Sequence, residues 1–299
     1  TLRKKVLFIF LLAFVVFCVV YALEFVISNK LSRERLYNAV LTGQESTWGK
    51  VREAAYERML FYAYDAKPGK PSIWRLRGRR SPVEAVLSGN PKKVKRAIMP
   101  LYKNLQKDKI LDIIWVFDSE DIPLLIAKNK TDLNKYNKLE NFVSPTVLQL
   151  ITQTKKQKVA QKAFILANEE IYATVSFPIF SNARIIGTVL YGKKIDPLIS
   201  DLAINTKSEA FVFHSKLGFI YGTNPNLIKL AKPRFSLFSY DILESNNGVF
   251  LANSLKFSMK EDHIQLLFLL DVSEGYKKQQ LYYLVTLGLI VLVALILII

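Results

Sequence analysis

The sequence predicts an α+β fold: a long N-terminal helix, two tandem modules that each hold an antiparallel sheet with covering helices, and two flanking transmembrane helices. Three observations predict this fold. Uncharged apolar segments stand at residues 6–23 and 281–299 of the 299-residue chain. Helical hydrophobic spacing continues beyond the first of these segments. Between them, β-rich apolar runs alternate with short segments that begin at helix-capping residues.

The first apolar segment, VLFIFLLAFVVFCVVYAL, has eighteen residues without a charge, and its apolar character resumes directly after Glu24. A helix of this length rises about 27 Å, close to the roughly 30 Å of a bilayer core. The stretch FVI that follows Glu24 lacks the small-residue pattern of a signal-peptide cleavage site. The sequence therefore predicts a retained transmembrane helix over residues 6–27, preceded by a cytoplasmic flank at residues 1–5.

The second apolar segment, LYYLVTLGLIVLVALILII, opens with a tyrosine pair that suits a membrane interface. It predicts a second transmembrane helix over residues 281–299. A natural protein rarely ends flush with a membrane helix. We therefore expect the chain to be truncated, with a cytoplasmic output domain, such as a kinase or a diguanylate cyclase, following Ile299.

Basic residues set the expected orientation. Arg3, Lys4 and Lys5 favour a cytoplasmic N-terminus, whereas a lysine pair before the second segment weakens that preference. We expect a multi-pass protein of the cell inner membrane, with residues 28–280 in the periplasm or outside the cell.

Charge limits the set of partners. The chain carries 42 Lys and Arg against 25 Asp and Glu, a net charge of +17 that favours anionic ligands. No zinc-finger or RNA-module signature accompanies this charge, so nucleic acid is not an expected partner. The only cysteine, Cys18, lies in the first apolar segment, so the region outside the membrane forms no disulfide.

Metal and enzyme chemistry have little support in the sequence. The two histidines, His214 and His263, belong to no close cluster of metal ligands, so we expect no metal and no other cofactor. The chain has no G-x-S-x-G, Walker or G-x-G-x-x-G motif, and we therefore expect it not to be an enzyme. The acidic run DSED at residues 118–121 fits a turn between strands better than a Ca²⁺ site.

A long amphipathic helix is predicted over residues 31–64, continuous with the membrane helix. Gly43 and Gly49 are its weak points, and the alternative is a pair of helices broken near Gly43. The apolar positions recur mainly at three- and four-residue steps: Leu36, Val40, Trp48, Val51, Ala55, Met59 and Tyr62.

The first module, over residues 28–195, includes this long helix. Ser81-Pro82, Asn90-Pro91 and Ser144-Pro145 each begin a further helix, since a capping side chain precedes proline at the first helical position. Five strands are expected from β-rich runs, at residues 110–117, 122–127, 162–167, 170–178 and 184–194.

The second module, over residues 196–280, repeats the pattern in shorter form. Asp196-Pro197 begins a helix, and EAFVFHSKLGFIYGT forms a hairpin that turns at residues 215–218. Two more strands follow, in GVFLANSLKFSM and HIQLLFLLDVS, which brings the expected strands of this module to four.

This layout resembles the double Cache sensor domains of bacterial transmembrane receptors, which contain two successive PAS-like sheets. FPIFSNARIIGTVLYGKKI is similar to the family's strand pair that leads into the inter-module helix. WRLRGRRSPVEAVLSGN followed by DIIWVFDSEDIPLLIA is similar to the variant of chemoreceptors, diguanylate cyclases and sensor kinases. The resemblance implies a small-molecule pocket in the membrane-distal module. The family's Arg-x-Trp motif for amino acids is not found, since Trp74 precedes Arg75.

Candidate ligand-binding residues follow from strand alternation. Tyr172, Thr174 and Ser176 share one face of their predicted strand. Trp115 and Phe117 share a face of theirs and could supply an aromatic wall. The alternative is that these aromatic side chains are ordinary core.

Arginines in WRLRGR offer a second candidate. Arg75 and Arg77, with Arg79, alternate in sequence and could clamp a carboxylate or phosphate if this segment is extended. The alternative is that all three are simply exposed.

The sequence therefore favours an extracytoplasmic sensing domain that binds a small molecule, expected to be anionic, and passes a helix shift through the membrane. Dimerisation along the long helix is expected, although its apolar stripe could equally pack on its own modules. The alternative function is a membrane-anchored envelope scaffold for anionic partners.

Overall fold

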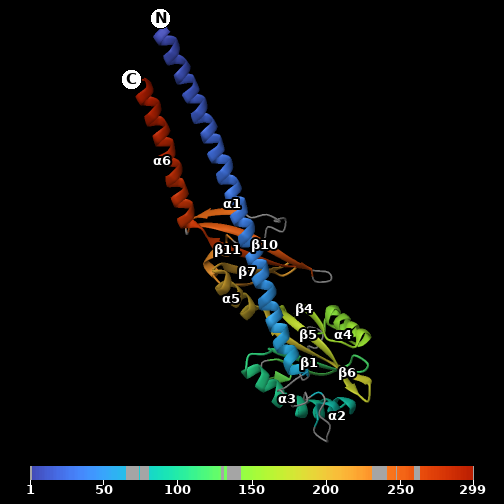
Figure 1. Ribbon diagram of the computed structural model, residues 1–299. Coiled ribbons are helices and arrows are strands. Elements are labelled where there is room, and N and C mark those ends of the chain that lie inside the picture. Colours follow the sequence, from blue (N-terminus) through green and yellow to red (C-terminus); the bar gives the residue numbers. More distant parts are fainter. Residues whose placement is uncertain are drawn as a thin grey trace.

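A computed structural model describes residues 2–64, 74, 81–128, 131–132, 143–230, 241–246, 248–258 and 263–298. Two antiparallel sheets follow one another along a single helix, α1 (Leu2–Tyr64), and the two chain ends lie together at one end of the molecule (Figure 1). The α+β class with two sheet modules on a long N-terminal helix is thereby confirmed.

Helix α1 is continuous over 63 residues. The alternative of a break near Gly43 is wrong, because both this residue and Gly49 lie within regular helix. Its apolar stripe packs partly on its own modules: Trp48 and Met59 are buried in the main hydrophobic core, while Leu36 is 61% exposed. The stripe is therefore used chiefly to attach the sheets to the helix.

The sheet farther from the two chain ends, which we call the distal sheet, has the strand order β3-β2-β1-β6-β5-β4 (Figure 1). It has six strands instead of the expected five, because the two-residue β3 adds an edge to β2. Its strands are β1 (Ile113–Asp118), β2 (Pro123–Lys128), β3 (Thr131–Asp132), β4 (Gln161–Ala167), β5 (Glu170–Ser181) and β6 (Arg184–Lys194).

Helices cover both faces of this sheet. On one face, α2 (Pro82–Leu87) and α3 (Pro91–Lys107) join α1 in the main core. On the other face, α4 (Pro145–Gln157) encloses a separate hydrophobic cluster. All three short helices begin at the expected caps, where the side chains of Ser81, Asn90 and Ser144 accept backbone N–H groups.

The second sheet has the order β8-β7-β11-β10-β9 and follows α5 (Ile195–Thr206). It has five strands instead of the expected four, because β9 pairs with the edge of β10. Its strands are β7 (Glu209–His214), β8 (Gly218–Gly222), β9 (Asp241–Ser245), β10 (Gly248–Ser258) and β11 (His263–Asp271), with a short 3-10 helix, η4 (Pro225–Leu227), after β8.

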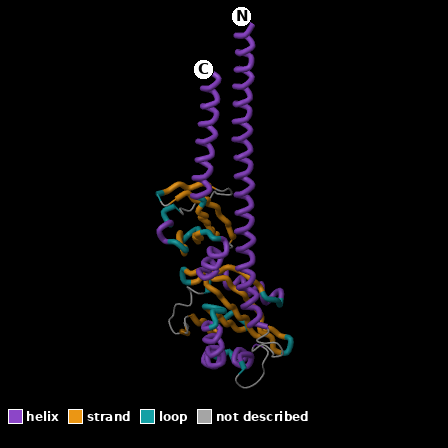
Figure 2. Tube along the Cα trace, turned by 60° about the vertical axis from the view of Figure 1, so that its left-hand side comes forward, coloured by secondary structure: helices purple, strands orange, loops and turns teal. Residues whose placement is uncertain are grey.

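The last strand runs almost directly into α6 (Ser273–Ile298), which lies beside the N-terminal half of α1 (Figure 2). The rings of Phe25 and Tyr283 join the two helices, with centroids 5.6 Å apart. By length and composition, one helix among the described residues could cross a membrane: α1, whose most apolar window has a mean hydropathy of 2.1 and no buried residue.

Candidate functional site

The sequence-predicted residues of β1 and β5 lie together on the face of the distal sheet that α4 covers. Trp115 pairs with Leu190 of β6, which pairs in turn with Ser176 of β5. The rings of Trp115 and Tyr172 meet edge to face, with centroids 5.9 Å apart. The shared face inferred from strand alternation is therefore present, and Phe117 and Thr174 lie on it as well.

This face is closed in the structure. All five residues are completely buried, and none lines either of the two cavities described below. The hydroxyl group of Thr154 on α4 lies 2.8 Å from both the Leu150 carbonyl oxygen and the Ser176 hydroxyl oxygen. A ligand could reach the face only if α4 moved outward, so ligand binding by these residues stays a prediction.

Arg75 and Arg77 lie outside the described residues. Their neighbour Trp74 is buried on the opposite face of the sheet, where its indole N–H donates to the Tyr191 hydroxyl over 2.8 Å. The ring of Phe177 packs edge to face against both Trp74 and Tyr191.

Charged side chains border the closed face. Glu170 accepts hydrogen bonds from the Lys128 ammonium and the Tyr172 hydroxyl, and it pairs with Lys194 at 2.6 Å. Burial acts to raise the pKa of Glu170, but these hydrogen bonds outweigh burial and hold the pKa below its usual value. Burial and the Glu170 carboxylate both raise the pKa of Tyr172, which keeps its hydroxyl protonated.

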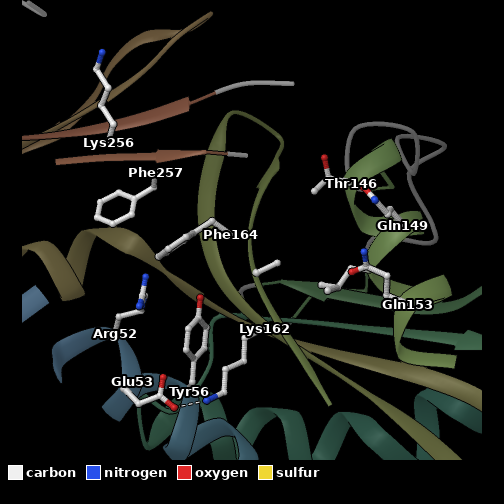
Figure 3. Close-up of a pocket in the computed structure, with 12 residues that line it drawn as sticks. Arg52, Glu53, Tyr56, Thr146, Gln149, Gln153, Lys162, Phe164, Lys256 and Phe257 are labelled. Carbon is white, nitrogen blue, oxygen red and sulfur yellow. Dashed lines mark hydrogen bonds and ion pairs between the residues drawn. The ribbon is translucent and has the colours of Figure 1, made fainter. Parts of the chain in front are cut away.

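A cavity of about 630 Å³ lies where the two modules meet along α1 (Figure 3). We call it the junction pocket. Helix α1, helix α4, strand β4 and strand β10 all contribute to its wall, and the lining residues are Arg52, Glu53, Tyr56, Thr146, Gln149, Leu150, Gln153, Lys162, Ala163, Phe164, Lys256 and Phe257. The sequence does not predict this site, because its residues come from four separate segments.

Aromatic rings from both modules meet at one side of the junction pocket. Phe164 of β4 stacks on Trp48 of α1 at a centroid distance of 6.0 Å. Phe257 of β10 contacts both rings, at 5.6 Å from Trp48 and 6.2 Å from Phe164. This group joins the two sheets through the helix.

A second cavity, of about 780 Å³, lies within the module of the second sheet, which we call the proximal module. Its wall combines the end of α5 with strands of the second sheet and the segment around η4. Glu209 accepts hydrogen bonds from Thr223 and Asn224 there, and the hydroxyls of Ser200 and Tyr221 are 2.8 Å apart.

Among the described residues, no group of three or more His, Cys, Asp or Glu side chains could hold a metal ion. The acidic turn after β1 is organised by Asp118, whose Oδ1 accepts the N–H groups of Glu120 and Ile122 over 2.8 and 2.9 Å. The run DSED therefore forms a turn between β1 and β2, as expected from the sequence.

The solved structures similar to this chain include sensory domains of chemoreceptors. The sensory domain of the Campylobacter jejuni chemoreceptor Tlp3 with isoleucine bound is 14% identical, with a TM-score of 0.50 over 81% of this chain and 94% of that one. The same receptor's ligand-binding domain with L-valine gives a TM-score of 0.51 at 14% identity and the same coverage. The ligand-binding domain of Pseudomonas fluorescens CtaA with L-isoleucine is 12% identical over 84% of this chain and 98% of that one, with a TM-score of 0.46.

No protein-family model and no curated protein matches the sequence. The likeness to the Campylobacter jejuni domain is therefore one of fold, and it confirms the double Cache arrangement expected from the sequence.

Proposed function

We propose that this chain is the extracytoplasmic ligand-sensing part of a transmembrane signalling receptor. The continuity of α1 carries the proposal. This one helix contacts β5 of the distal sheet and, through Gln44 and Trp48, β10 of the second sheet, and its N-terminal part is an exposed apolar segment. At the other end, only Val272 separates β11 from α6. A displacement of one module relative to the other can thus reach both helices without crossing a flexible linker.

The proposed division of the chain follows these connections. Residues 6–27 and 281–299 span the inner membrane, and residues 28–280 lie on its outer side as modules 28–195 and 196–280. A cytoplasmic output domain completes the receptor, and two copies pair along α1.

The proposed ligand site is the α4-covered face of the distal sheet. Tyr172, Thr174 and Ser176 offer polar groups beside the aromatic wall of Trp115 and Phe117. Glu170 lies at the border with two lysines, so both signs of charge are available to a small polar ligand. Ligand binding would move α4 away from the sheet. The free energy available for signalling is the difference between the ligand's binding free energies for the open and closed states.

Ligand binding is tested by thermal shift on the full chain in detergent micelles. The related Campylobacter jejuni domain holds isoleucine or valine, so these amino acids are screened first, followed by organic acids, amines and nucleobases. A ligand at about a hundredfold excess over its Kd adds about 2.7 kcal/mol to the unfolding free energy. Loss of the shift in Tyr172→Phe would place the ligand on this face, and loss in Arg75→Ala would assign it to the arginine segment.

Signalling is tested separately by measuring how far α1 and α6 move. Spin labels at Lys30→Cys and Lys277→Cys, in a Cys18→Ser background, report the distance between the two helices in lipid nanodiscs. A ligand-dependent change in this distance supports the receptor. Ligand binding without any change would instead favour the second candidate function, an envelope scaffold whose net charge of +17 attracts anionic partners.

A further inference from the structure

We propose that the junction pocket binds a small organic anion that has one carboxylate and a flat apolar body. This site is separate from the distal face and goes beyond the proposed sensing function. A ligand here would touch both modules and α1 at once, because each contributes to the wall.

The guanidinium of Arg52 is the group that would bind the carboxylate of the ligand. Its Nε atom is buried and has no hydrogen-bond partner in the part of the chain that the structure describes. A buried donor without a partner costs free energy, and a carboxylate placed beside the guanidinium would remove that cost. Lys162, the next cation along the wall, is already neutralised by an ion pair with Glu53. Lys256 also belongs to the lining, but Figure 3 shows its ammonium directed away from Arg52 and Tyr56. Arg52 is thus the cation that an incoming carboxylate would meet beside the aromatic rings.

Tyr56 adds a second donor beside Arg52. Figure 3 shows the Tyr56 hydroxyl and the Arg52 guanidinium both directed toward Phe164. Burial raises the pKa of Tyr56, so its hydroxyl stays protonated and can donate at neutral pH. The Lys162 ammonium lies 5.5 Å from the centre of the Tyr56 ring and holds that ring in place.

The apolar body would lie against the aromatic rings of Phe164 and Phe257. These two rings come from different modules and are 6.2 Å apart at their centroids. Aromatic rings pack best edge to face or offset on other flat rings. The cavity of about 630 Å³ is within the size range of small-molecule sites in general.

The wall opposite these rings is polar and uncharged. Gln149 and Gln153 project from α4 with Thr146 on the same side of the pocket (Figure 3). Their amide groups can donate to a carboxylate or hydroxyl oxygen without adding a competing negative charge. The pocket thus combines the Arg52 guanidinium, the Lys162–Glu53 ion pair, neutral donors and an apolar surface.

Isothermal titration calorimetry on the full chain in nanodiscs of zwitterionic lipid tests the proposal, with benzoate as the probe. Benzamide has the same flat body without the charge, and acetate has the charge without the body. We expect saturable benzoate binding, with benzamide and acetate each weaker by about tenfold or more. Arg52→Gln should weaken benzoate by about tenfold or more, whereas the matched control Arg58→Gln, an exposed arginine on the same helix, should leave it unchanged.

Phe257→Leu provides an independent variant from the proximal module, useful if Arg52→Gln fails to fold. It should weaken benzoate by roughly threefold or more through lost ring packing. Absence of saturable benzoate binding, or equal affinity in wild type and both variants, would overturn the proposal. If Tyr172→Phe loses benzoate binding while Arg52→Gln and Phe257→Leu keep it, benzoate binds at the distal face, and the proposal is also overturned. Failure of the amino-acid screen leaves this test untouched, because none of the five residues proposed for the distal face lines the junction pocket.

Discussion

The indole of Trp115 occupies the space that a side chain on Gly192 would need. A Cβ placed on Gly192 would lie 2.8 Å from Cζ3 of Trp115 and 2.6 Å from Cγ2 of Ile113. Both contacts are closer than real Cβ atoms show, and both neighbours are completely buried. The missing side chain thus leaves room for the Trp115 indole beneath α4.

Gly192→Ala is therefore expected to destabilise the distal module by about 1–3 kcal/mol, because the core must shift to accept one methyl group. Urea denaturation monitored by tryptophan fluorescence gives the difference. Trp115→Phe should reduce the penalty in a double-mutant cycle, since a smaller ring frees part of the space. Gly49→Ala is the matched control: nothing lies within 4 Å of its Cβ, and a helix interior favours alanine by about 0.5–1 kcal/mol. Equal stability of Gly192→Ala and wild type would contradict the packing described.

Glu170 should make the distal module sensitive to acid. Its folded-state pKa is lowered, so its ion pairs contribute stability at pH values above the ordinary carboxyl pKa of about 4.3. This contribution is lost as the pH falls through the lower, folded-state pKa. The melting temperatures of wild type and Glu170→Gln should differ at pH 7 and converge toward pH 3.

The neighbouring Glu169→Gln serves as the control for that series, because Glu169 is exposed in the same turn. It should follow the wild type at each pH. A difference between wild type and Glu170→Gln that is as large at pH 3 as at pH 7 would show that the charge of Glu170 is not its source.

Asp118 should stabilise the β1–β2 turn through its side-chain oxygen. Asp118→Ala removes the acceptor of two backbone N–H groups and is expected to cost about 1 kcal/mol. Asp118→Asn keeps an acceptor oxygen and should cost much less. Thermal unfolding with and without Ca²⁺ checks both points: a clear rise in melting temperature with Ca²⁺ would restore the metal interpretation of this turn.

Gln44 should fasten α1 to the proximal module. Its side-chain oxygen accepts from Asn253 of β10, and its amide donates to Ser208 over 3.4 Å, all within buried surroundings. Gln44→Leu leaves these partners unpaired and should destabilise the proximal module by about 1–3 kcal/mol. Hydrogen exchange in β10 should then accelerate, while the exposed neighbour change Glu45→Gln should leave the exchange unaltered.

Most helices and strands could be predicted from the sequence, because capping residues and hydrophobic alternation act within a few neighbouring residues. Ser81, Asn90 and Ser144 each precede a proline, and each caps a helix that begins at that proline. The two strands that were missed, β3 and β9, lie at sheet edges. A two-residue strand such as β3 has no measurable alternation, and it exists only because β2 offers backbone groups to pair with.

In the candidate site, too, one part was predictable from the sequence and another part was not. Alternation along β5 correctly placed Tyr172, Thr174 and Ser176 on one face, because side chains of a strand point to opposite sides in turn. Alternation reports that a face is covered but not what covers it. The closure of this face by α4, through Thr154 and Ser176, could not be read from the spacing of residues.

The sequence by itself determined the two-module α+β plan, the long amphipathic helix and the starts of α2, α3 and α4, since hydrophobic period and capping act over a few neighbouring residues. The expected start of α5 at Asp196-Pro197 is wrong: the helix begins at Ile195, after Lys194, without a side-chain cap. Only the tertiary structure decided that Phe164 and Phe257 meet beside Arg52, and that Gly192 makes room for Trp115. Those contacts join segments far apart in the chain, and they depend on how close-packed side chains from separate elements share one volume.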